Sequence, residues 1–79
     1  METAPLIKML NNIGAFYETM PDRPKAIADM AKHIRSFWDP RMRRTMTEYL
    51  QQYPDGQSTE GELNEFSRSA FNYLLENLK

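Results

Sequence analysis

The dipeptide Asp39–Pro40 interrupts the middle of this chain and limits what it can fold into. A residue that precedes proline avoids helical dihedrals, and aspartate is a favoured N-cap, so Asp39 should end one helix and begin another. On both sides apolar residues recur every three or four positions. The stripes are Ile27, Met30, Ala31, Ile34 and Trp38 before the break, and Met42, Met46, Tyr49, Leu50 and Tyr53 after it. We predict helices over approximately 23–38, capped by Asp22, and 40–52.

Two further helices are predicted toward the ends of the chain. The first covers approximately 4–19, with Thr3 as its N-cap, Met20–Pro21 as its stop, and a stripe formed by Leu6, Met9, Leu10, Ile13, Phe16, Tyr17 and Met20. The last covers approximately 60–78 after a Pro54-Asp55-Gly56 turn, with Thr59 and Glu62 as a capping box. We therefore expect an all-α fold, a single helical domain over 1–79 built as a small bundle of about four short helices.

Length and composition narrow the class of protein. The chain has 79 residues, 41% of them hydrophobic, and no cysteine. It has no thiols for disulfides or thiolate metal sites, and a domain of this size buries only about 60% of its unfolded surface. The amino-terminal stretch lacks the pattern of a signal peptide, and no apolar run is long enough to span a bilayer. We expect a cytoplasmic protein that gains stability from a partner.

The last predicted helix has an unusually wide apolar face. Its stripe of Leu63, Phe66, Ala70, Tyr73 and Leu74 is broadened by Phe71, Leu75 and Leu78. Such a face either contacts a partner or belongs to a helix that is buried by its own chain. Phe71 and Leu75 are therefore candidate contact residues, and a free-standing interaction module or a homodimer is one alternative for the function.

Charge gathers where the two central helices meet. Lys32, Arg35, Arg41, Arg43 and Arg44 lie within a stretch whose only acid is Asp39. Cations in the first turn of a helix oppose its macrodipole, so the three arginines after Pro40 are not explained by helix stability. Arginine and aromatic residues are enriched at interface hot spots. We predict that the arginines contact a partner and that Phe37 and Trp38 pack between the helices.

The sequence offers little for catalysis. There is one histidine, His33, and there is no glycine-rich phosphate loop and no histidine pair at metal-ligand spacing. Asp29 lies four residues before His33, where the two would more often form an ordinary surface contact than a catalytic dyad. Short helices beside arginines also resemble a helix-turn-helix nucleic-acid binder, but the turn lacks the usual glycine and the carboxy-terminal part is acidic. We predict no catalytic residues and no metal site.

The run His33-Ile34-Arg35-x-Phe37-Trp38-Asp39-Pro40-Arg41-Met42-Arg43 resembles the hallmark segment of the small delta subunit of cytoplasmic, NAD-dependent, molybdenum-containing formate dehydrogenases. The resemblance extends upstream through Met9, Asn12-Ile13, Phe16-Tyr17 and Ile27-Ala28-Asp29, so it covers about residues 6–44. Beyond residue 50 it is weak.

This resemblance implies a non-catalytic accessory subunit that assists assembly of the complex or insertion or retention of its molybdenum cofactor. The molybdenum bis-guanine-dinucleotide pterin, iron–sulfur clusters, flavin and NAD would be bound by other subunits. The expected partners are the catalytic and other subunits, and the molybdenum cofactor or its insertion factor. The candidate partner-binding residues are His33, Arg35, Phe37, Trp38, Arg41, Arg43, Arg44, Phe71 and Leu75, with Asp39 and Pro40 as structural residues of the helix joint.

Overall fold

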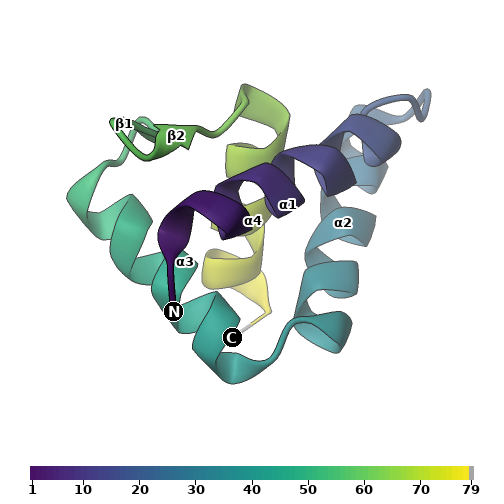
Figure 1. Cartoon of the computed structure of the whole chain (residues 1–79). Helices are drawn as coiled ribbons and strands as arrows, with labels where there is room; N and C mark the ends of the chain where they lie inside the picture. Colours follow the sequence, from purple (N-terminus) through teal and green to yellow (C-terminus); the bar gives the residue numbers. More distant parts are fainter. Residues whose placement is uncertain (79) are drawn as a thin grey trace.

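The protein is a small helical bundle with one short hairpin (Figure 1). The structure, a computed structural model, describes residues 1–78. Its elements in chain order are α1 (Thr3–Tyr17), α2 (Arg23–Phe37), α3 (Pro40–Gln52), β1 (Gln57–Ser58), β2 (Gly61–Glu62) and α4 (Glu65–Asn77). Helix α1 packs against α2, α3 and α4, and α4 also packs along α2. The predicted all-α class is confirmed, with the hairpin as an addition.

The two central helices agree best with the sequence, because their ends are set by local chemistry. Helix α3 has the predicted bounds, and α2 ends one residue earlier than expected. The carboxylate of Asp22 caps α2 by accepting a hydrogen bond from the backbone N–H of Lys25 at 3.2 Å. Proline follows the cap within the first turn of each helix, where a missing N–H costs nothing.

Helix α1 differs from the prediction at both ends and in the face that it buries. Its N-cap is Glu2, which makes no side-chain cap bond, so the assignment of Thr3 was wrong. The helix ends at Tyr17 and not at residue 19. Its buried residues are Leu6, Ile7, Leu10 and Gly14, whereas Met9 and Phe16 of the predicted stripe are 42% and 63% exposed. The buried face of α1 is therefore centred closer to Gly14 than the predicted stripe, and the small glycine allows α4 to approach closely.

The predicted start of the last helix was wrong. Thr59 lies in the turn of an antiparallel hairpin in which Gln57 pairs with Glu62 and Ser58 with Gly61. Helix α4 begins at Glu65, and its N-cap is Asn64, whose side-chain oxygen accepts from the N–H of Ser67 at 2.8 Å.

Tertiary contacts explain why the hairpin forms in place of an earlier helix start. Gly56 has a φ of 74°, a conformation that favours glycine, and its carbonyl accepts from the N–H of Leu63 at 2.8 Å. The Tyr49 hydroxyl lies 2.9 Å from Ser58 Oγ. Asn11 of α1 donates to the Glu62 carbonyl at 2.7 Å.

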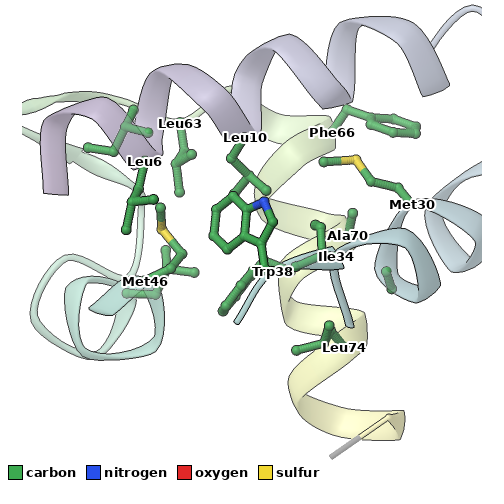
Figure 2. Packing of buried hydrophobic residues seen from close by; sticks show 14 of the residues in the cluster. Leu6, Leu10, Met30, Ile34, Trp38, Met46, Leu63, Phe66, Ala70 and Leu74 are labelled. Carbon is green, nitrogen blue, oxygen red and sulfur yellow. The ribbon is translucent and has the colours of Figure 1, made fainter. Parts of the chain in front are cut away.

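One apolar core is shared by all four helices (Figure 2). Figure 2 shows the indole of Trp38 among side chains of this cluster, which include Leu10 of α1, Ile34 of α2, Met46 of α3 and Leu74 of α4. The wide apolar face of α4 is explained by this core, because α4 packs against two helices at once. Within residues 1–78, no helix is both long enough and apolar enough to cross a membrane.

Candidate functional site

The joint between α2 and α3 is a two-residue turn closed by Asp39. One carboxylate oxygen of Asp39 accepts from the N–H groups of Arg41 at 2.8 Å and Met42 at 3.1 Å. The bond from Met42 contributes most to lowering the pKa of Asp39 below its ordinary value, and the bond from Arg41 and the charges of Arg41 and Arg43 add to it. This negative cap compensates part of the cost of arginines at a helix N-terminus. Asp39 is thus the N-cap of α3.

The two aromatic residues of the joint point in opposite directions. Trp38 is 4% exposed and lies in the core, with its ring centre 6.3 Å from that of Phe71. Phe37 is 75% exposed, so the expectation that it packs between the helices was wrong. Phe71 is fully buried, which leaves it no surface for a partner, and Leu75 is half-buried against the core. Phe37 is thus the aromatic residue of the joint that faces solvent.

The arginines of the joint have no carboxylate partner among residues 1–78. The ion pairs in that part of the chain are Arg23 with Glu65 at 3.1 Å and Lys25 with Asp29 at 2.9 Å. Arg35, Arg41 and Arg44 are exposed, and Arg43 is half-buried with its Nε buried and without a hydrogen-bond partner in the described chain. A group of unpaired guanidinium ions is therefore presented at and after the α2–α3 turn.

Two of these arginines line a shallow depression of about 460 Å³ together with Met1, Thr45 and Glu48. We name it the arginine groove. It lies where the start of the chain passes α3, as Figure 1 shows for the amino terminus. Guanidinium groups of Arg41 and Arg44 provide planar donor sets that suit carboxylate or phosphate oxygens. Both arginines were candidate partner contacts from the sequence alone, but nothing in the sequence indicated that Met1 would lie beside them.

A second depression, of about 470 Å³, lies where the end of α1 meets the C-terminal half of α2. We name it the aromatic groove; its lining includes Phe16, Tyr17, Met20, Lys32, His33 and Phe37. His33 lies between two rings, with centres 6.0 Å from Tyr17 and 4.7 Å from Phe37. Sequence reasoning named His33 and Phe37 but assigned Phe16 and Tyr17 to the core, because their spacing matches the helical stripe.

Comparison with family models decides between the alternatives. The model of the NADH-dependent formate dehydrogenase delta subunit, FdsD, matches residues 5–71. The chain belongs to this delta subunit family. The FdsD match continues past the segment that first suggested the family, through the hairpin and into α4. Searches of curated proteins and of solved structures give no match.

The side chains of this FdsD-family member do not suit the metal centres expected of the whole dehydrogenase. Iron–sulfur clusters are held by cysteine thiolates, and the chain contains no cysteine. Within residues 1–78 no group of three or more histidine, aspartate or glutamate side chains is placed to hold a metal ion. The Asp29 carboxylate accepts a hydrogen bond from Lys25 rather than from His33.

The N-terminus of α3 does not present free N–H groups. Phosphate groups are often bound by free N–H groups at a helix N-terminus. At α3 the N–H groups of Arg41 and Met42 already donate to the Asp39 carboxylate and are not free for a phosphate. Membership of the FdsD family implies association with other formate dehydrogenase subunits.

Proposed function

We propose that this chain is a non-catalytic accessory subunit of an NAD-dependent formate dehydrogenase. In this proposal it docks on the catalytic subunit and assists assembly of the complex or the insertion or retention of the molybdenum cofactor. The observation that carries the proposal is the FdsD family match over residues 5–71. The exposed, unpaired arginines of the joint support it, since they lie in the segment that most resembles the family.

The arginine groove is the proposed contact for acidic groups of the partner. Arg41 and Arg44 lie on one face of α3, three residues apart, and so can reach the same partner surface. Arginine pairs with carboxylates and phosphates through two parallel hydrogen bonds, which fix orientation as well as add binding energy. The groove therefore suits carboxylates of the catalytic subunit, or the phosphates of the pterin dinucleotide if that cofactor is exposed during assembly.

The function is tested by producing the dehydrogenase with and without this chain. We expect the complex without it to contain less molybdenum per catalytic subunit and to oxidise formate more slowly. We also expect the chain to copurify with the catalytic subunit when both are present. If molybdenum content, formate oxidation and subunit association are all unchanged by its removal, the proposal is wrong.

The docking surface is tested by reversing charges. Arg41→Glu and Arg44→Glu should each weaken binding to the catalytic subunit by about tenfold or more, because a like charge would then face the partner's acids. The matched control is Lys8→Glu, which makes the same charge change at an exposed position of α1 that lines neither groove. Equal losses for Lys8→Glu and the two arginine variants would point to a general effect of charge rather than to the groove.

A further inference from the structure

The aromatic groove is lined by two large hydrophobic side chains that the chain leaves exposed. Phe37 is 75% exposed and Phe16 is 63% exposed, although the same chain buries Trp38, Phe66 and Phe71 almost completely. Both exposed rings line the one depression. Exposed apolar patches bounded by polar residues are typical of interaction sites, and aromatic residues are enriched at interfaces.

The rings of the groove form a connected series that fixes its shape. The ring centres of Phe16 and Tyr17 are 5.2 Å apart at an angle of 85°, an edge-to-face contact. Tyr17 contacts His33, and His33 contacts Phe37 at 4.7 Å. These contacts join the end of α1 to the end of α2, and the two exposed phenylalanines are the first and last rings of the series. A preformed site loses less entropy on binding than a flexible one.

The charge at the rim indicates the kind of partner. The groove contains one acid, Asp29, whose Oδ2 is 2.9 Å from Lys25 Nζ, so that its charge is already compensated. Lys32, which also lines the groove, has no ion-pair partner among residues 1–78. The uncompensated charge of the rim is positive. A ligand that combines an apolar side chain with an acidic neighbour complements both the aromatic rings and the positive charge of the groove.

The geometry points to a second docking contact: the aromatic groove binds an apolar side chain of the catalytic subunit that is flanked by aspartate or glutamate. The apolar side chain packs between Phe16 and Phe37, and the acidic neighbour pairs with Lys32. This inference rests on the proposed docking to that subunit. It adds a contact at the opposite end of α1 from the arginine groove, since Met1 lines one groove and Phe16 the other.

Exposed positions make the inference testable without damage to the core. We expect Phe37→Ser and Phe16→Ser each to weaken binding to the purified catalytic subunit by about tenfold or more, as for a central aromatic contact. Met9→Ser is the matched apolar control, because Met9 is 42% exposed on α1 but does not line the groove. Lys32→Glu should weaken binding more than Lys8→Glu. Unfolding curves of all five variants should match the wild type.

A photo-crosslinking amino acid in place of Phe37 identifies the occupant. We expect a crosslink to a segment of the catalytic subunit with an aspartate or glutamate within four residues of the attached side chain. A crosslink to a second copy of this chain, or to a segment with only basic neighbours, would overturn the inference. So would wild-type binding by both phenylalanine variants.

The two proposals fail in different ways. If the arginine variants lose affinity and the phenylalanine variants do not, the aromatic groove is not a docking site and the proposed function stands. If the wild-type chain itself does not bind the catalytic subunit, the proposed function fails and the groove loses its stated occupant.

Discussion

Ser67 of α4 lies directly against Gly14 of α1, so closely that there is no room for a side chain at position 14. A methyl group built on Gly14 would collide with the Ser67 hydroxyl oxygen and come within 3.3 Å of its Cβ. That hydroxyl donates to the Leu10 carbonyl at 3.1 Å and is fully buried. The close crossing of α1 and α4 therefore depends on a small residue facing a small polar one.

Gly14→Ala should destabilise the fold. Alanine favours a helix interior over glycine by about 1 kcal/mol, but overpacking of a tight contact costs about 1–3 kcal/mol. We expect a net loss of up to about 2 kcal/mol in the free energy of urea unfolding. Asn12→Ala, at an exposed position of the same helix, is the control and should change it by less than about 0.5 kcal/mol.

A double-mutant cycle tests whether the Ser67 hydroxyl is the cause. Ser67→Ala alone should cost about 1 kcal/mol through the lost hydrogen bond. Combined with Gly14→Ala it should cost less than the sum of the single losses, because the collision is relieved. Strict additivity would show that the methyl group disturbs something other than Ser67.

Neighbouring aromatic residues at the joint should behave very differently. Trp38→Ala removes a buried indole and should cost about 3–5 kcal/mol, with a reduced helical circular-dichroism signal. Phe37→Ala changes an exposed ring and should alter the free energy of unfolding by less than about 0.5 kcal/mol. Comparable losses in the two variants would mean that the Phe37 ring is packed in solution.

Asn11 joins the hairpin to the bundle. Its side chain donates to the Glu62 carbonyl at 2.7 Å and accepts from the Asn64 N–H at 2.9 Å. Asn11→Ala should cost about 1–3 kcal/mol, from two hydrogen bonds of about 0.5–1.5 kcal/mol each. Hydrogen exchange should increase first at the N–H of Asn64 and in the adjoining hairpin. Unchanged exchange there would show that Tyr49 and Gly56 alone hold this segment.

Asp39 should make stability depend on pH. Its pKa is lower in the folded protein than the value of about 3.9 in an unfolded chain, because it accepts two backbone hydrogen bonds and faces Arg41 and Arg43. The carboxylate thus adds stability above the unfolded value, and this contribution is lost as pH falls through the lower folded value. The substitution Asp39→Asn keeps a capping oxygen and removes the charge. We expect Tm to fall less on acidification in this variant than in the wild type, and parallel curves would contradict this.

Local signals were sufficient for the central part of the fold. Asp22 and Asp39 each combine a capping side chain with a following proline, and both helices begin where these residues place them. The start of α4 was not predictable in this way, because Thr59 and Glu62 have capping-box spacing while Asn64 and Ser67 form the cap that is used. The hairpin forms in place of an earlier helix start because of contacts with residues distant in the sequence, which no local pattern reveals.

The same distinction applies to the candidate site. The arginines were predictable because their clustering conflicts with helix stability, a property of the sequence alone. The exposure of Phe16 and the burial of Phe71 were not predictable. Helical spacing shows which residues share one face of a helix, but it does not show how far other elements cover the two ends of that face. Phe71 packs near Trp38 in the core, whereas Phe16, at the end of α1, is left 63% exposed.

Helix α1 also has a mechanical consequence. With 15 residues at 1.5 Å each, it is about 22 Å long; Met1, just before it, lines the arginine groove, and Phe16, near its end, lines the aromatic groove. Helices α2, α3 and α4 all pack against α1, so its position relative to the two grooves is fixed. Partner segments seated in both grooves would be held at a set spacing, and once one was seated the other would meet its groove at a raised effective concentration. If both proposed contacts form, the chain would bind a correctly folded partner surface more tightly than one whose segments are misplaced.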